Sequence, residues 1–167
     1  MTNLSSDFLG SLPQLTGTPP TIDLDLLPEE PRELFARWFR EAVDAGVPEA
    51  KAMTVATVDA DGLPDARMVD LQSVDENGWT FITGKASAKA AQLTANPAAA
   101  LNFWWQPQIR AVRIRGEATP IPIGEYAQAW RVDPIHVEFW QSTAKQENTR
   151  IRYERTEMGW ERSIETP

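Results

Sequence analysis

The sequence predicts a mainly β (α+β) fold, an antiparallel barrel of six to eight strands with helices packed outside it. Short runs of β-branched and aromatic residues are separated by turn sequences such as DADG (59–62) and DENG (75–78). Two segments show convincing helical periodicity, and no internal repeat divides the chain. A chain of 167 residues is long enough to bury one core, so we expect one domain.

The N-terminal third contains an arm and a helix. Residues 1–28 are rich in Ser, Thr, Pro and Gly, and we expect them to form an irregular arm before a folded domain at 29–167. A helix begins at Pro31, because proline suits the first helical turn, and it ends near Gly46. Its apolar residues recur at helical spacing and predict a face that packs on the core: Leu34, Phe35, Trp38, Phe39, Ala42 and Val43.

The remaining elements are mostly strands, as the change to a two-residue period indicates. Residues 87–96 predict a second helix with Ser87 as its N-cap. Residues 123–130 predict a short helical turn, and a last hairpin is expected over 157–165. The predicted strands cover residues 53–59, 66–74, 79–83, 100–106, 109–121, 136–143 and 150–156.

The composition narrows the classes of function. The net charge of −8 and the sequence pI of about 4.7 argue against a general nucleic-acid-binding surface. There is no Cys and one His, His136, which excludes thiolate chemistry and a multi-histidine metal site. The first residues do not form a typical secretory signal, and no stretch is apolar enough to span a membrane, so we expect a cytoplasmic protein.

The side chains offer little catalytic machinery of their own. The sequence lacks both G-x-G-x-x-G and a Gly-rich phosphate loop, so an enzyme of this sequence would depend on a cofactor for the difficult chemistry. Seven Trp stand against two Tyr. Such an excess is typical of interfaces or ring-shaped ligand sites, and core filling accounts for it equally well.

Two cations predict an anion site. Alternation along the second predicted strand puts Arg67 on the same face as Val69 and Leu71. Lys89 lies in the first turn of the second predicted helix, where the helix dipole is positive. Arg67 and Lys89 together therefore predict a clamp for a phosphate group. The alternative is that Arg67 pairs with one of the many acids and that Lys89 is solvated.

Five sequence blocks follow one another in a distinctive order: MTVATVDADGLPDARMVDLQ (53–72), WTFITGKASAKAAQLTANP (79–97), VRIRGEA (112–118), RVDPIHVEFWQ (131–141) and R-x-x-Y from Arg150. Their joint order resembles the pyridoxamine 5'-phosphate oxidase family. The resemblance implies an FMN-binding split β-barrel, usually a homodimer with flavin at the subunit interface. Arg67 and Lys89 match ligands of the FMN phosphate, Met68 and Val69 run alongside the isoalloxazine, Thr83 matches the threonine after the third strand, and Trp140 and Arg150 match contacts from the other subunit.

The chain resembles a shortened and divergent member of the family. It departs from the family pattern where the substrate binds. The motif R-x-V-L-L-K reads RMVDLQ here, so Asp70 replaces a leucine and Gln72 replaces the lysine that holds the substrate phosphate. Ala111 stands where a flavin-contacting glutamine is common, and Ala88 replaces the arginine of S-R-K. The substrate-binding R-L-H stretch reads QEN, ending at Asn148, and a long segment before RVDP is largely missing.

The resemblance implies an FMN-dependent oxidoreductase. The departures imply that it acts on a small organic substrate other than pyridoxamine phosphate. Asp70, Gln72 and Asn148 are the candidate substrate-pocket residues, and Asp70 is expected to repel a phosphate. The alternatives are a genuine pyridoxamine or pyridoxine phosphate oxidase, a secondary-metabolism oxidase of the phenazine type, and a flavin- or deazaflavin-binding protein without turnover. No catalytic side chain is assigned, and no metal, nucleic acid or membrane partner is expected.

Overall fold

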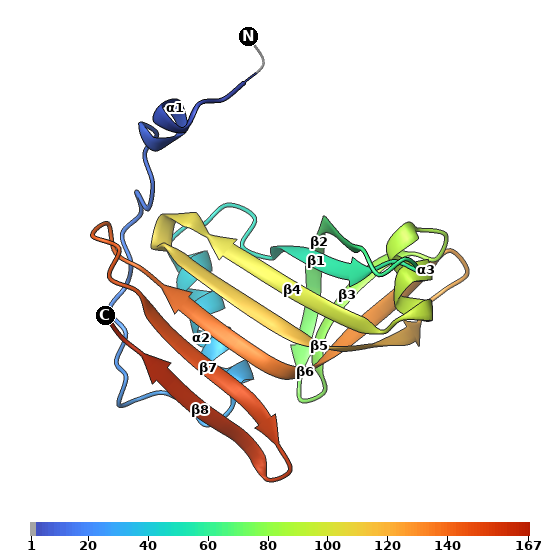
Figure 1. Ribbon diagram of the computed structural model, residues 1–167. Helices are drawn as coiled ribbons and strands as arrows, with labels where there is room; N and C mark the ends of the chain where they lie inside the picture. Colours follow the sequence, from blue (N-terminus) through green and yellow to red (C-terminus); the bar gives the residue numbers. More distant parts are fainter. Residues whose placement is uncertain (1–2) are drawn as a thin grey trace.

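The computed structural model describes residues 3–167, and its centre is a closed antiparallel barrel (Figure 1). The strand order is β3-β2-β1-β4-β5-β6-β7-β8, and an additional pairing of β3 with β6 closes the first six strands into the barrel. The last two strands extend the sheet beyond the closure. The strands are β1 (Ala52–Val58), β2 (Pro64–Asp75), β3 (Gly78–Gly84), β4 (Ala98–Trp105), β5 (Arg110–Pro122), β6 (Ala127–Gln141), β7 (Thr149–Thr156) and β8 (Gly159–Glu165).

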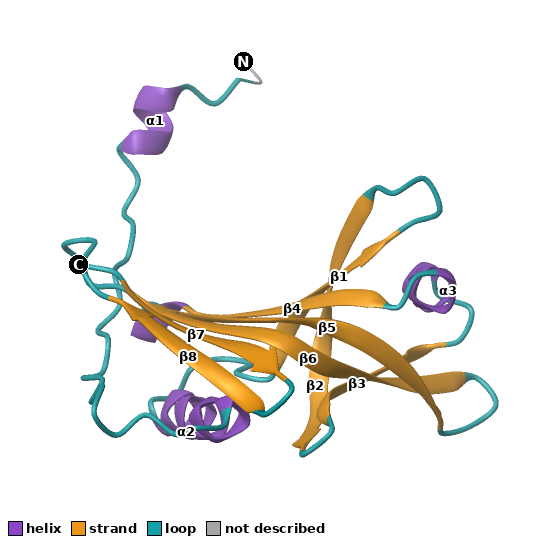
Figure 2. Cartoon of the chain, turned by 60° about the horizontal axis from the view of Figure 1, so that its bottom comes forward, coloured by secondary structure: helices purple, strands orange, loops and turns teal. Residues whose placement is uncertain are grey.

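Three helices and one short turn complete the chain. Helix α2 (Pro31–Asp44) packs on the sheet at one end of the molecule, and α3 (Ala88–Ala95) lies at the other end (Figures 1 and 2). Helix α1 (Ser6–Gly10) stands away from the sheet on the extended arm, and a single 3₁₀ turn, η1 (Gln106–Gln108), joins β4 to β5. The predicted fold class, a mainly β barrel with flanking helices, is therefore confirmed.

Helix α2 follows the predicted apolar pattern closely. Pro31 occupies its first turn, and Gly46 adopts a φ of +70° just beyond its end, where L side chains are disfavoured. Phe35 packs against the rings of Trp79, Phe103 and Trp105, with ring centroids 5.0–6.1 Å apart. The predicted stripe was wrong at Val43, which is 52 % exposed although Ala42 beside it is fully buried. The buried face of the last turn therefore follows the line of Leu34, Trp38 and Ala42, four residues apart.

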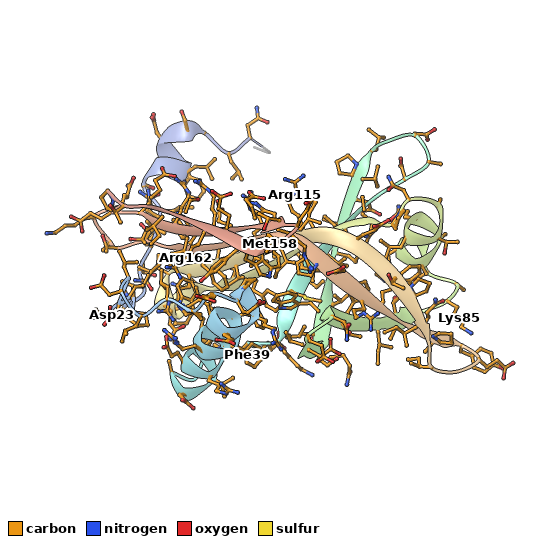
Figure 3. All side chains as sticks on the ribbon, turned by 90° about the horizontal axis from the view of Figure 1, so that it is seen from below. Asp23, Phe39, Lys85, Arg115, Met158 and Arg162 are labelled. Carbon is orange, nitrogen blue, oxygen red and sulfur yellow. The ribbon has the colours of Figure 1, made fainter. Side chains whose placement is uncertain are left out.

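One charged residue reaches the core and connects α2 to the sheet. Arg110 on β5 is only 1 % exposed, and its guanidinium carbon lies 3.9 Å from the centre of the Trp38 ring. Its nitrogens donate to Glu41 Oε2 on α2 at 2.5 Å and to Gln141 Oε1 on β6 at 2.7 Å. As the alternation predicts, Arg113 and Arg115 lie on the opposite, exposed face of β5, and Figure 3 shows Arg115 and Phe39 on opposite sides of the sheet.

The N-terminal arm is largely irregular, as expected, although residues 6–10 form α1. The arm is held to the domain by apolar side chains that pack on the core, among them Leu24 and Leu27, and by hydrogen bonds. The N–H of Thr18 donates to the Pro107 carbonyl at 2.8 Å, and Gln141 Nε2 donates to the Pro20 carbonyl at 2.8 Å. A Cβ at Gly17 would lie 2.4 Å from the Pro107 carbonyl oxygen, so only glycine permits this close approach.

The predicted helical turn over residues 123–130 was wrong. Residues 123–126 form the loop that joins β5 to β6, and β6 begins at Ala127. Residues 128–132 of β6 pair with β3 on one side and with β5 on the other. Two ladders of backbone hydrogen bonds therefore outweigh the weak helical pattern of this segment.

Candidate functional site

The first part of the candidate site is centred on Arg67 of β2. Its Nη1 donates to Thr57 Oγ1 on β1 at 2.6 Å and to the Asp65 carbonyl at 3.3 Å. Its Nη2 donates to Gln92 Oε1 on α3 at 3.0 Å and forms an ion pair with the Asp65 carboxylate. Arg67 therefore pairs with an acid, as the alternative to a phosphate clamp expected for this residue.

The second part of the site lies between β3 and the start of α3. Ser87 caps the helix, because its hydroxyl accepts from the Ala90 N–H at 3.4 Å, and it also lies 3.2 Å from Thr83 Oγ1. Lys89 Nζ donates to Thr83 Oγ1 at 3.0 Å. An ammonium group, two hydroxyls and the positive end of a helix therefore meet at one place.

Helix α3 brings the two parts together. Lys89 and Gln92 are three residues apart on α3, so they lie on the same side of the helix, and Gln92 contacts Arg67. The donor set therefore holds a guanidinium, an ammonium and two hydroxyls beside a helix N-terminus. This chemistry fits a phosphate monoester dianion, which accepts charge-assisted bonds from several directions. Both predicted phosphate ligands are therefore linked to α3, Lys89 as part of it and Arg67 through its bond to Gln92.

The exposed face of β2 carries the other predicted residues of this strand. Met68, Asp70 and Gln72 are exposed, whereas Val69 is half-buried with Arg67. Lys51 Nζ bonds to the Asp70 carboxylate at 3.0 Å. The expected repulsion of a phosphate by Asp70 is therefore weakened, because the pair is close to neutral.

Gln72 occupies an irregular position of β2. The pairing of β2 with β3 passes from Leu71 to Ser73, so Gln72 has no partner across this ladder in the described part of the chain. Such bulges are common beside functional sites, because they redirect a side chain. Gln72 also borders a groove of about 320 Å³ between β2 and α2.

Trp140 and Arg150 lie at the opposite end of the barrel from α3. They are paired across β6 and β7, and Arg150 bonds to Glu165 at 3.2 Å. Trp140 is twelve residues along β6 from Gln128, the partner of Thr83, which corresponds to roughly 40 Å of strand. One chain therefore does not bring Trp140 and Arg150 to its own Arg67 and Lys89. Asn148, in the loop before β7, is close to Arg150 in sequence and half-buried.

Trp104 of β4 is a neighbour of Trp140 that the sequence did not reveal. Ala111 of β5 pairs with both residues, and its small side chain leaves room between them. The two indole rings lie 6.2 Å apart between centroids, and Trp104 is 46 % exposed. This face of the sheet therefore presents an open aromatic pair. Four other Trp, at 38, 79, 105 and 130, fill the core, so core filling accounts for most of the Trp surplus.

His136 is structural in its contacts. It is buried on β6, and its Nδ1 lies 2.5 Å from Glu154 Oε1 on β7. Its Nε2 has no hydrogen-bond partner among residues 3–167. The same described residues contain no group of three or more His, Asp or Glu placed to hold a metal ion. None of their helices is both long and apolar enough to cross a membrane.

Sequence reasoning missed four polar residues that shape the site: Thr57, Asp65, Gln92 and Lys51. Asp65 could have been found from the sequence, because it is two residues before Arg67 and shares its face of β2. Gln92 could also have been found, since it is about one helical turn after Lys89. Thr57 and Lys51 reach the site through the pairing of β1 with β2, which the local sequence does not specify.

Comparisons with known proteins agree with the fold. A family model described as pyridoxamine 5'-phosphate oxidase matches residues 39–159. The crystal structure of PhzG from Burkholderia lata, in complex with tetrahydrophenazine-1-carboxylic acid, superposes with a TM-score of 0.83, covering 90% of this chain and all of that one at 23% identity. A pyridoxamine 5'-phosphate oxidase-related, FMN binding protein from Nostoc punctiforme gives 0.68, over 87% and 99% of the chains at 19% identity.

Sequence relatives show the family. The pyridoxine/pyridoxamine 5'-phosphate oxidase of Bordetella pertussis is 43% identical over 129 residues, which are 76% of this chain and 61% of that protein. This chain thus spans about three fifths of the length of such relatives. The enzyme of Rhodopseudomonas palustris is 34% identical over 178 positions, covering 76% of this chain and 84% of the relative, so it has residues without a counterpart here. The chain belongs to the pyridoxamine 5'-phosphate oxidase family.

Proposed function

We propose that the protein is an FMN-dependent oxidoreductase whose substrate is a small organic molecule other than pyridoxamine 5'-phosphate. The observation that carries the proposal is the set of donors around α3, which suits the phosphate of FMN. Lys89, Thr83 and Ser87 meet at the N-terminus of this helix, and Arg67 bonds to Gln92 one turn further along it. Membership of an oxidase family and the likeness to an FMN binding protein support it.

In this proposal the chain supplies binding and orientation. Bound flavin would supply the redox chemistry, a hydride exchange with the substrate. Arg67 and Lys89 would hold the phosphate, and the neighbouring Met68 and Val69 of β2 would run along the ring system. Residues 64–70 of β2 pair with β1, and the strand continues into its pairing with β3 from Leu71, so β2 offers an ordered support for this arrangement.

The cofactor site is tested by removing its cations. Arg67→Ala and Lys89→Ala should each weaken FMN binding about tenfold or more, because each removes a charge-assisted contact worth about 1.5–3 kcal/mol. The measurement is calorimetric titration of the flavin-free variants with FMN. Lys85→Ala is the matched control, since Lys85 is an exposed lysine just before the same helix. Unchanged FMN affinity in both variants would leave the proposed phosphate clamp without support.

We further propose a homodimer in which Trp140 and Arg150 of one subunit complete the flavin site of the other. The length of β6 that separates Trp140 from Gln128, the partner of Thr83, supports a second copy, as does the exposed pair formed by Trp104 and Trp140. Light scattering combined with flavin absorbance is expected to give two chains and two flavins per particle. A flavin-loaded monomer would contradict this assembly.

The substrate proposal rests on β2. Gln72 lacks the charge that would hold a substrate phosphate, and Lys51 is engaged by Asp70. We therefore expect slow oxidation of pyridoxamine phosphate. The double variant Gln72→Lys with Asp70→Leu adds one cation and releases another, so it should bind pyridoxal phosphate more tightly than the wild type. Asn148 is the remaining candidate for the pocket, at the end of the sheet that a second subunit would contribute.

The second candidate is a genuine pyridoxine/pyridoxamine 5'-phosphate oxidase, which the names of relatives at 43% identity favour. The two candidates differ in one measurement, the rate at which the flavin-loaded protein oxidises pyridoxamine phosphate. A turnover of about 1 s⁻¹ or faster lies in the usual enzyme range and would favour the second candidate. Loaded protein with a rate far below this value would favour the first.

A further inference from the structure

The guanidinium proposed to bind the flavin phosphate already has an anion bound to it. Both terminal nitrogens of Arg67 are engaged, Nη1 by Thr57 Oγ1 at 2.6 Å and Nη2 by Gln92 Oε1 at 3.0 Å and by the Asp65 carboxylate. Asp65 brings the only negative charge among these partners. It occupies the acceptor position that a phosphate oxygen would require on Nη2.

The three partners of Arg67 differ in their freedom to move. Thr57 is buried, and Gln92 lies on a helix, where its Oε1 also accepts from Thr57 at 2.5 Å. The Asp65 side chain is 50 % exposed, against 20 % for Arg67, and it follows the turn over residues 59–63. The carboxylate can therefore rotate into water while Thr57 and Gln92 continue to orient the guanidinium.

We propose that Asp65 is an intramolecular competitor of the flavin phosphate for Arg67, and that it limits the affinity of the protein for FMN. This inference rests on the proposed function. Phosphate binding displaces the carboxylate of Asp65 from Nη2, so part of the binding free energy is spent on breaking an existing ion pair. A carboxylate that stays nearby also repels the phosphate dianion.

The opposite role, in which Asp65 positions Arg67 for the phosphate, is less consistent with the contacts. Arg67 keeps a bond on each terminal nitrogen without Asp65, from Thr57 and from Gln92. Gln92 Nε2 lies 3.4 Å from Asp65 Oδ2, a weak contact, so the orientation of Gln92 depends mainly on Thr57. Removal of the acid therefore leaves the guanidinium oriented and makes one of its edges available.

The test compares flavins with and without a phosphate. Asp65→Asn in the full-length, flavin-free protein should bind FMN about fivefold more tightly than the wild type, as the loss of a competing, partly buried ion pair implies. Riboflavin, which has no phosphate, should bind both proteins equally. Asp61→Asn is the matched control, because Asp61 is an exposed acid in the adjacent turn, and it measures the general effect of removing one negative charge.

A double-mutant cycle separates direct competition from long-range charge. In an Arg67→Ala background, Asp65→Asn should no longer improve FMN affinity beyond the effect of Asp61→Asn. In the protein that keeps Arg67, FMN binding by Asp65→Asn that is equal to or weaker than that of the wild type would overturn the inference and leave the proposed function intact. If neither the wild type nor Asp65→Asn binds FMN, the proposed function fails, and this inference fails with it.

Discussion

The buried ion pair between Arg110 and Glu41 should be among the most sensitive points of the fold. Burial lowers the pKa of Arg110, while the hydrogen bond and the charge of Glu41 act in the opposite direction. Glu41→Ala removes this partner and leaves a guanidinium, 1 % exposed, with only Gln141 and the Trp38 ring. Breaking a buried pair in this way costs about 3–5 kcal/mol.

The geometry places the expected loss at the lower end of this range. The Glu41 side chain is 39 % exposed, so water can reach the end of the guanidinium after the change. We expect the free energy of unfolding to fall by about 3 kcal/mol, which corresponds to a melting temperature roughly 6–12 °C lower for a chain of this size. Urea unfolding followed by Trp fluorescence measures it, because Trp38 lies directly against Arg110.

An exposed ion pair provides the control. Arg155 and Asp133 are joined at 2.6 Å, but both side chains are largely exposed, so Asp133→Ala should cost at most about 1 kcal/mol. If Glu41→Ala and Asp133→Ala lower the free energy of unfolding equally, burial does not decide the strength of these pairs. The reasoning that makes Arg110 the link between α2 and the sheet would then be refuted.

Two further changes test the attachment of the N-terminal arm. Burial raises the pKa of Tyr153, and Arg162 partly offsets this rise. The neutral phenol therefore stabilises the folded state below the unfolded pKa of about 10. This contribution to the free energy of unfolding is lost as the pH rises through the higher folded pKa. Tyr153→Phe should therefore flatten the alkaline fall of unfolding free energy between pH 9 and 11, measured by urea titration; an unchanged slope would contradict this reasoning. Gly17→Ala should displace the arm from η1 and speed limited proteolysis before residue 30, with little change in the melting temperature of the barrel; equal proteolysis rates would contradict the close approach.

The sequence predicted the barrel because its strands alternate locally. The turns at 59–62 and 75–78 were readable for the same reason, since Asp59 and Asp75 accept hydrogen bonds from N–H groups two residues later. The start of β6 was misread because its strand character comes from pairing with β3 and β5, which no short window contains. Val43 was misread because helical spacing defines an apolar stripe but not its width, and the sheet buries Ala42 without its neighbour.

The candidate site was predictable only in part. Arg67 and Lys89 stood out because cations on an apolar strand face and at a helix start are unusual. The sequence did not indicate which of its many acids would pair with Arg67, and the structure identifies Asp65 as the partner. The pair of Lys51 with Asp70 depends on the register of β1 and β2, and it corrects the expected repulsion by Asp70. The pair of Trp104 with Trp140 spans three strands and has no local signature.

The attachment of the arm has a consequence for the order of folding during synthesis. Tyr153 and Arg162, on the last two strands, donate to the Pro28 and Leu27 carbonyls at 2.8 Å, across 125 and 135 residues of chain. A ribosome adds about 5–20 residues per second, so the arm waits on the order of ten seconds for these partners to be made. Leu24 and Leu27, which pack on the core in the folded protein, stay unburied in that interval, and the emerging chain offers chaperones an apolar segment near its N-terminus until β8 is complete.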